Sequence, residues 1–183
     1  CGLPGQTLES FGRTLETLMT LRPDHISVYP LQLEEGTPLA RLEEQGRIAV
    51  PDEDFQAVCM DLAAEKLAGA GFERYEVASY ALPGQRCRHN IAYWTGKPYL
   101  GLGRSAAGMF DIPATSEMCN LGTYPFYTSG ANLSSAPQEE RVRYRQLDNE
   151  GTQFDTEHLT PREAMAEDLM LACRMTDGIP LDL

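Results

Sequence analysis

The chain has 183 residues, a hydrophobic content of 42% and a formal net charge of −12. This length and composition are typical of one globular domain, or slightly more than one, with enough apolar residues for a stable core. The strong acidity disfavours binding to nucleic acids, whose phosphate backbone is also negative. The sequence also lacks the run of about 20 apolar residues that a membrane span requires. We therefore expect neither a nucleic-acid partner nor a membrane span.

The cysteines are spread along the chain at Cys1, Cys59, Cys87, Cys119 and Cys173. They form no Cys-x-x-Cys pair, so the sequence predicts no local metal-binding knuckle. An odd number of cysteines without a secretion signal favours reduced thiols in a cytoplasmic protein. Cys59 and Cys173 fall on the apolar faces of predicted helices and are expected in the core. The sequence begins without Met and stops where a new element is expected, so we interpret the chain as a piece of a larger protein.

The first part of the chain predicts a strand, a helix and a second strand. Residues 1–7 end a strand and enter a Pro-Gly turn, residues 8–21 carry apolar residues at helical spacing, and residues 25–29 form a short strand. This order is typical of a parallel βαβ unit, in which ligands bind beyond the carboxyl ends of the strands. Three polar residues follow the two strand ends and are expected to share one rim: Gln6, Gln32 and Glu34. The alternative is that each is a solvated loop residue.

Further helices and a strand follow. Residues 39–45 and 51–70 predict helices, and Gly71 caps the second one. The apolar stripe of that second helix is predicted to comprise Phe55, Val58, Cys59, Leu62 and Leu67. Residues 72–80 predict a strand of alternating character. Near the end of the chain, Thr160 opens a capping box before a helix that is expected to run to about residue 176. Its predicted apolar face consists of Met165, Leu169, Ala172 and Cys173.

The stretch from His89 to Gly108 contains the only tryptophan, Trp94, and four glycines. Neither a helix period nor a strand period explains it, so residues 94–98 predict a turn and residues 99–103 a short extended piece. Its glycines leave room for another group to approach the backbone closely. One interpretation is a tight corner packed with aromatic rings. The other is a ligand wall in which residues 105–107 supply small side chains and free N–H groups. The Gly-Leu-Gly run lacks the third glycine of a dinucleotide fingerprint, which excludes that class of site.

The region after Gly108 is less regular. Residues 109–127 predict one or two strands of a hairpin, and residues 129–140 predict a polar loop. Residues 141–145 predict a strand with one face in water, because charged and apolar residues alternate there. Three arginines on this strand form the only dense basic cluster: Arg141, Arg143 and Arg145. We expect them to face solvent, with a carboxylate-rich ligand as the alternative.

Several motifs occur in an order that resembles a known family. They are Gly2–Thr7, Asp24–Tyr29, Glu34–Pro38, Gly71-Phe72 with Tyr75-Glu76, His89-Asn90 with Tyr93-Trp94, Tyr99–Gly103, and Glu167–Met170 with Gly178-Ile179. Together they resemble the oxygen-independent coproporphyrinogen III oxidase-like family of radical S-adenosylmethionine (SAM) enzymes, and most closely its haem-chaperone branch. The resemblance covers nearly the whole chain and fits least well in residues 111–150.

The resemblance implies an α/β fold that is the C-terminal part of a partial (β/α) barrel. Residues 1–110 would supply the last strands and helices of the barrel, residues 111–158 an α+β extension, and residues 159–183 the start of a small helical C-terminal domain. The cofactors implied for the full-length parent are SAM and a [4Fe–4S] cluster. The residues implied on the SAM side are Gln6, Gln32, Glu34, Ser105 and Ala107.

The cluster of this family needs three closely spaced cysteines, because thiolates are the soft ligands that iron–sulfur clusters require. The cysteines of this chain do not have that spacing. The fragment alone is therefore expected neither to hold the cluster nor to cleave SAM. Whether the parent is an enzyme of the oxidoreductase type is left open by the sequence.

A four-residue signature, HNxxYW, is associated with haem in this branch. It is matched by His89, Asn90, Tyr93 and Trp94, and His89 could bind haem iron through a neutral nitrogen. The alternative is a structural histidine. The intact signature favours a haem chaperone over an oxidase that converts coproporphyrinogen III to protoporphyrinogen IX by oxidative decarboxylation. For that oxidase the three arginines would meet the substrate carboxylates.

A third hypothesis, from an unrelated class, is a small acidic interaction domain. The expected partner in the favoured reading is haem or another tetrapyrrole. A partial barrel also leaves a strand edge open, which invites pairing with a second copy of the chain.

Overall fold

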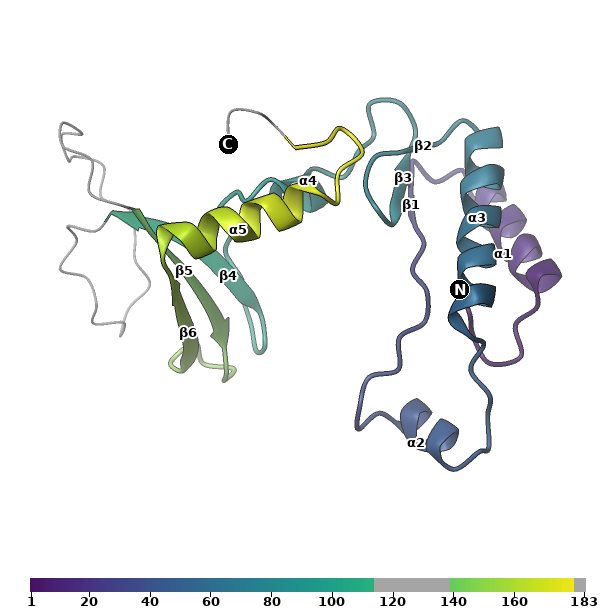
Figure 1. Ribbon diagram of the computed structural model, residues 1–183, viewed down its shortest axis with the longest axis horizontal. Helices are drawn as coiled ribbons and strands as arrows, with labels where there is room; N and C mark the ends of the chain where they lie inside the picture. The colour runs from purple at the N-terminus through teal and green to yellow at the C-terminus, as the bar shows by residue number, and fades with distance from the viewer. Residues whose placement is uncertain (114–138, 180–183) are drawn as a thin grey trace. The chain divides into compact units, whose positions relative to one another are not determined.

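The structure is a computed structural model in which residues 1–113 and 139–179 are described. Helices and strands occur together, which confirms the predicted α/β class (Figure 1). The chain forms two compact units, one of residues 1–87 with 175–177 and the other of residues 88–174 with 178–183. The three-part division expected from the resemblance stays a prediction.

The first unit combines three helices with a small sheet. Its elements are α1 (Leu8–Thr20), β1 (His25–Ser27), α2 (Pro38–Glu44), α3 (Glu53–Gly69), β2 (Glu73–Arg74) and β3 (Ser79–Ala81). The three helices agree with the predicted ranges to within a residue or two. Capping explains their ends: Thr7 forms a capping box with Ser10, Asp52 accepts a hydrogen bond from the amide of Phe55 at 2.9 Å, and Gly71 follows α3 with a φ of +89°.

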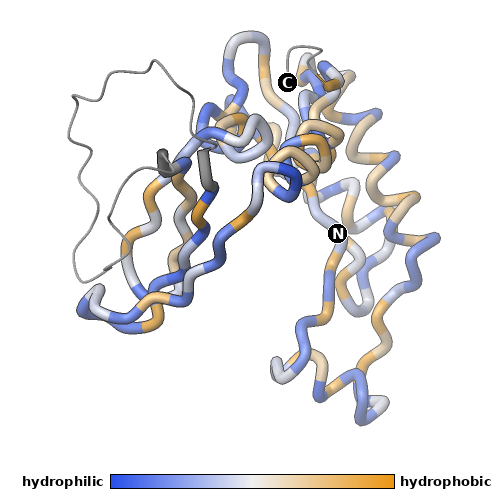
Figure 2. The backbone as a smooth tube through the Cα atoms, turned by 60° about the vertical axis from the view of Figure 1, so that its left-hand side comes forward, coloured by the Kyte–Doolittle hydropathy of each residue, from blue (hydrophilic) through white to orange (hydrophobic). Residues whose placement is uncertain are grey.

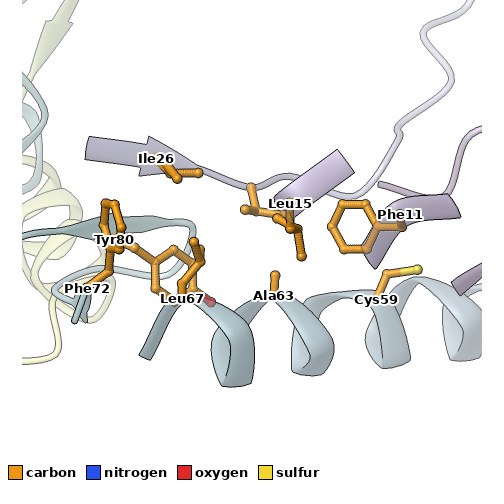
Figure 3. Packing of buried hydrophobic residues seen from close by; sticks show 9 residues of the cluster. Phe11, Leu15, Ile26, Cys59, Ala63, Leu67, Phe72 and Tyr80 are labelled. Atoms are coloured by element: carbon orange, nitrogen blue, oxygen red, sulfur yellow. The ribbon is translucent and has the colours of Figure 1, made fainter. Parts of the chain in front are cut away.

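The core of this unit lies between α1 and α3. Cys59, Ala63 and Leu67 follow one another at four-residue spacing along α3 and face Phe11 and Leu15 of α1 (Figure 3). Ile26, Val28, Phe72 and Tyr80 complete the buried cluster. The predicted burial of Cys59 is confirmed, and burial raises the pKa of its thiol. Val58, which was predicted in the same apolar stripe, is 48% exposed, because the inward face is centred on Ala63 instead.

Residues 72–80 form a bent hairpin rather than the single strand that alternation predicted. β2 and β3 pair with each other, and Arg74 lies opposite Tyr80. The amide of Tyr75 donates to the carbonyl of Ser79 at 3.2 Å, which closes the bend. Both faces of this segment are covered, since Tyr75, Glu76, Ala78 and Ser79 are all buried. Alternation therefore does not mark one wet and one dry side here.

The sheet of the first unit is antiparallel, in the order β1-β3-β2. The predicted parallel βαβ pairing survives only in part. The terminal ammonium nitrogen of Cys1 donates to the carbonyl of Tyr29 at 2.7 Å, and the carbonyl of Cys1 accepts from the amide of Leu31 at 2.8 Å. Two bonds from one residue to positions two apart are the slanted pattern of a parallel pair. The loops after the two predicted strands are therefore joined at this point.

Residues 175–177 also belong to the first unit. Met175 forms a bridge with Glu76, and the amide of Thr176 donates to the carbonyl of Tyr75 at 3.1 Å. Asp177 forms an ion pair with Arg86 at 2.6 Å. A short piece near the end of the described chain thus adds to the small sheet region.

The second unit is a three-stranded antiparallel sheet covered by a helix. Its elements are α4 (Arg88–Trp94), β4 (Ala107–Pro113), β5 (Glu139–Gln146), β6 (Phe154–Leu159) and α5 (Pro161–Ala172). The strand order is β4-β5-β6, and α5 lies over the sheet (Figure 1). The predicted strand over residues 141–145 is confirmed as part of β5, whereas β6 was not predicted. The predictions for residues 114–127 and 129–138 lie outside the described residues.

The helix α5 begins at the predicted capping box of Thr160 and Glu163 but presents a different face to the sheet. Met165 is 56% exposed, and Leu169 and Cys173 are exposed too. The predicted core position of Cys173 is therefore wrong. Glu167 and Asp168 point to the sheet instead, because arginines of β5 meet them there.

Hydrophobic and hydrophilic residues interleave along the helices of both units (Figure 2). Among the described residues, no helix is both long enough and apolar enough to cross a lipid bilayer.

Candidate functional site

The signature residues lie on a short helix, α4, where no helix was predicted. It ends where the amide of Thr95 donates to the carbonyl of Ile91 at 2.9 Å and that of Lys97 to the carbonyl of Ala92 at 3.0 Å. Gly96 follows with a φ of +63°, a conformation typical of the residue after a helix. Seven residues span less than two full turns, so too few apolar positions recur to reveal the period.

Three aromatic rings contact one another in series: two on one face of α4 and one just after it. His89 and Tyr93 are four residues apart, with ring centroids 4.6 Å apart and an interplanar angle of 85°. Tyr93 in turn meets Tyr99 edge-on at 4.4 Å. This arrangement orients the imidazole without a hydrogen bond, because edge-to-face contacts between rings are themselves attractive.

His89 is exposed, and its ring nitrogens have no hydrogen-bond partner in the described part of the chain. His25 provides the contrast, since its Nε2 lies 2.8 Å from the hydroxyl of Tyr75. The sequence left open whether His89 is locked by hydrogen bonds or open to a ligand. Among the described residues, the side chain is exposed and is not locked by a hydrogen bond.

A different face of α4 anchors the helix within the second unit. The guanidinium carbon of Arg174 lies 4.2 Å from the centroid of the Trp94 ring, a cation–π contact. The indole Nε1 is buried, and no hydrogen-bond partner for it occurs among the residues that the structure describes. Asn90 is half-buried, one turn before Trp94. Within the signature, Trp94 thus packs into the unit while His89 stays outside.

The glycines after α4 permit close approaches within the chain. A Cβ at Gly101 would lie 2.1 Å from the carbonyl oxygen of Ala107, and one at Gly108 would lie 2.2 Å from the ring of Tyr144. The Tyr144 hydroxyl accepts from the amide of Gly101 at 2.9 Å and donates to its carbonyl at 3.0 Å. The groups that approach these two glycines are therefore the chain's own, as in a packed corner.

Ser105 and Ala107 are exposed at the start of β4. The amide of Ser105 donates to the carbonyl of Gln146 at 2.7 Å, and that of Ala106 donates to the carbonyl of Gly103 at 3.0 Å. The expectation of free N–H groups in residues 105–107 is therefore wrong for Ser105 and Ala106. Ser105 also has a φ of +64°, which is uncommon outside glycine.

Three more residues predicted on the SAM side lie in the first unit. The Oε1 of Gln6 accepts from the amides of Gly2 and Leu3, at 2.7 Å and 3.3 Å, so this oxygen closes its own turn. Gln32 and Glu34 are exposed. These two side chains extend from the loop that Leu31 joins to Cys1.

The three arginines of β5 are neutralised by carboxylates of the chain itself. Arg141 donates to both carboxylate oxygens of Asp168, at 2.5 Å and 3.0 Å, and to Asp111 at 3.1 Å. Arg143 pairs with Glu157 and Glu167, and Arg145 pairs with Asp155. The Asp168 hydrogen bond is the main cause that raises the pKa of Arg141, against the effect of burial. A solvated face was expected for all three, and Arg145, whose side chain is 60% exposed, agrees with it, whereas the side chain of Arg141 is only 8% exposed. The correction follows from the acidic groups on α5 and β4, which the strand pattern alone does not reveal.

A hollow of about 580 Å³ opens beside His89. It is lined by Arg88, His89, Ile91, Ala92 and Lys97. The lining thus combines two cationic side chains, an imidazole and two apolar side chains, and no acidic side chain is among the lining residues. Elsewhere in the described ranges, no group of three or more His, Cys, Asp or Glu residues could hold a metal ion.

Comparisons with known proteins identify the family. The chain is 32% identical to the haem chaperone HemW of Mycobacterium tuberculosis over 180 residues, which is 98% of this chain and 42% of the relative. It is 33% identical to HemW of Synechocystis over 97% of this chain and 39% of the relative. The chain belongs to the HemW- and HemN-like radical SAM family.

One further relative and one solved structure also match the chain. The mitochondrial radical S-adenosyl methionine domain-containing protein 1 of Danio rerio is 39% identical over 59% of this chain and 24% of its own length. The structure of HemN, a radical SAM coproporphyrinogen III oxidase from Escherichia coli, matches with a TM-score of 0.59 and 17% identity over 95% of this chain and 38% of that one. The expected fold, part of a radical SAM enzyme fold, is confirmed by this match. No model of a protein family matches the sequence.

The chain spans about two fifths of the length of the HemW relatives. Its radical SAM character is therefore a property of the family to which it belongs. What this chain itself binds is argued from its own residues below.

Proposed function

We propose that this chain carries the haem-binding part of a HemW-like haem chaperone. The observation that supports the proposal most directly is the exposure of His89, whose ring nitrogens are engaged by no other described residue. A structural histidine is usually held by a hydrogen bond, as His25 is by Tyr75. A neutral imidazole on an open surface is free to bind the iron of a flat macrocycle.

The other signature residues support His89 in different ways. Tyr93 holds the imidazole edge-on, and Tyr99 holds Tyr93. Trp94 fixes the helix through Arg174. Haem itself would supply the iron and its aromatic face, while the protein supplies one ligand in a fixed orientation. The sequence motif indicates these four residues but does not assign a separate role to each of them.

The test is a titration of this chain with ferric haem, followed by the Soret absorbance. Wild type is expected to give a saturable shift that His89→Ala loses. His158→Ala is the matched control, because His158 is an exposed histidine on β6, remote from the signature in sequence. Equal binding by wild type and His89→Ala would contradict the proposal, as would no binding by any of the three.

In the full-length parent we propose that SAM lies beside the loops that carry Gln6, Gln32 and Glu34. The resemblance also assigns Ser105 and Ala107 to SAM, and that assignment stays a prediction. Exposed polar side chains at Gln32 and Glu34 fit this role, whereas Gln6 offers its amide nitrogen because its oxygen closes a turn. The [4Fe–4S] cluster would supply the electron for SAM cleavage from outside this chain. A cytoplasmic location fits the odd number of cysteines.

The alternative, an oxygen-independent coproporphyrinogen III oxidase, is less well supported. It would use cationic groups for the four carboxylates of its substrate, and the arginines expected for that task are held by acids of the chain. Pairing of open strand edges between two copies also stays a prediction.

A further inference from the structure

We infer that the hollow beside His89 binds the propionate carboxylates of haem through Arg88 and Lys97. The inference rests on the proposed function and adds to it the groups that select and orient the ligand.

The two cations are uncommitted, unlike most of the basic residues. Neither the Arg88 guanidinium nor the Lys97 ammonium has an ion pair or hydrogen bond with a described residue, and both residues are exposed. In the same unit Arg141, Arg143 and Arg145 are all paired with carboxylates. In a chain with a net charge of −12, two cations beside an imidazole that no described carboxylate neutralises are available to an anionic ligand.

The placement of the cations suits an amphipathic ligand. Arg88 comes just before His89 at the start of α4, Lys97 follows the turn at its end, and both line the hollow. Ile91 and Ala92 add apolar side chains to the same lining. Haem combines an apolar ring with two carboxylates on one edge. If the iron is bound to His89, the carboxylate edge of the haem would lie near side chains of opposite charge.

The pairing of these cations with the haem carboxylates is expected to contribute more to selectivity than to affinity. A guanidinium binds a carboxylate through two parallel hydrogen bonds, and an ammonium binds it as a point charge. Exposed pairs of this kind contribute little, since water competes for both partners. The iron–imidazole bond would therefore supply most of the affinity, while the cations discriminate in favour of free carboxylates.

The experiment compares ferric haem with its dimethyl ester, which has the same ring and iron but no carboxylate charge. Soret titrations of the whole chain use wild type, Arg88→Gln, Lys97→Gln and the double variant. Arg104→Gln is the matched control, because Arg104 is an exposed arginine of the same unit that lies outside the hollow and has no ion pair with a described residue. For haem we expect each single variant to bind about threefold more weakly and the double variant about tenfold. For the ester we expect equal affinities in all five proteins.

The outcomes separate the inference from the proposed function. Unchanged haem affinity in the double variant, with a Soret shift that still depends on His89, would overturn the inference alone. A double variant that loses the ester as strongly as haem would also overturn it, because the effect would then pass through the helix. No binding of haem by wild type would overturn the proposed function, and the inference with it.

Discussion

At the scale of single residues, Arg141 connects three elements of the second unit. It joins β5 to Asp168 on α5 and to Asp111 on β4, and its side chain is almost fully buried. The same Asp168 carboxylate leaves no space for a side chain at Gly96, where a Cβ would lie 2.4 Å from Oδ1. The ion pair thus joins the helix to the sheet, and its carboxylate lies against the turn after α4.

Arg141→Ala is expected to lower the free energy of unfolding by about 3 kcal/mol, because it leaves Asp168 partly buried without its cation. Arg145→Ala, on the same strand, is the control. Its pair with Asp155 has side chains 60% and 62% exposed, so we expect a loss below about 1 kcal/mol. Urea denaturation of both variants measures the difference. Equal losses would show that burial does not decide the strength of these pairs.

Individual residues could be predicted where one local property decides. Cys59 was placed in the core because it lies on the apolar side of a long helix, and it is buried. Cys173 was placed there by the same reasoning and is exposed. The difference arises because the acidic residues of α5 face the sheet. Which face of α5 is buried depends on arginines of β5, which lie far away in the sequence. The arginine partners on β4 and α5 were beyond prediction for the same reason.

At the scale of elements, the ends of helices were more predictable than their faces. The capping box of α5 is formed as expected: Thr160 donates its amide to the Glu163 carboxylate at 2.9 Å and accepts from the Glu163 amide at 3.4 Å. Capping uses residues three apart, so a short sequence window contains all the information. By contrast, α4 is too short to show a period, and β2 and β3 are joined by a bend that alternation misses.

The Glu163 cap makes a pH-dependent contribution to stability. Hydrogen bonds from Thr160 lower the pKa of Glu163 below its ordinary value of 4.5. A carboxyl group whose pKa is lowered in the folded state stabilises the fold above the unfolded pKa and loses that effect as pH falls through the folded pKa. Stability from this group should therefore decline below about pH 4.5.

Glu163→Gln keeps a side chain that suits a capping box but removes the titration. Its melting temperature should lie below that of wild type at pH 6, and the gap should close as pH falls below 4.5. Melting curves of the two proteins between pH 3 and pH 6 provide the measurement. A gap that stays constant across that range would contradict the electrostatic account.

At the scale of the whole molecule, the order of motifs predicted the fold better than the individual strands did. The family and the α/β class were expected from seven separated motifs, and relatives over nearly the whole chain confirm them. The predicted parallel pairing is confirmed only in part, because the described sheets are antiparallel. Strand pairing depends on contacts across the chain, which a local pattern does not contain.

The chain is predicted not to assemble an iron–sulfur cluster by itself. Cys59 is fully buried in the first unit, and Cys173 is exposed in the second. Reconstitution with ferrous iron and sulfide should give no stoichiometric absorbance of a [4Fe–4S] cluster. A cluster that forms in the chain and is lost in a Cys→Ser variant would refute this prediction.

The open setting of His89 bears on how fast a ligand would leave. A haem held through His89 would rest on an exposed helix face, where a group from another protein could reach it. An acceptor could then engage the haem before His89 releases it. Such an associative exchange makes the release rate depend on the concentration of the acceptor, whereas a buried pocket would impose a fixed residence time.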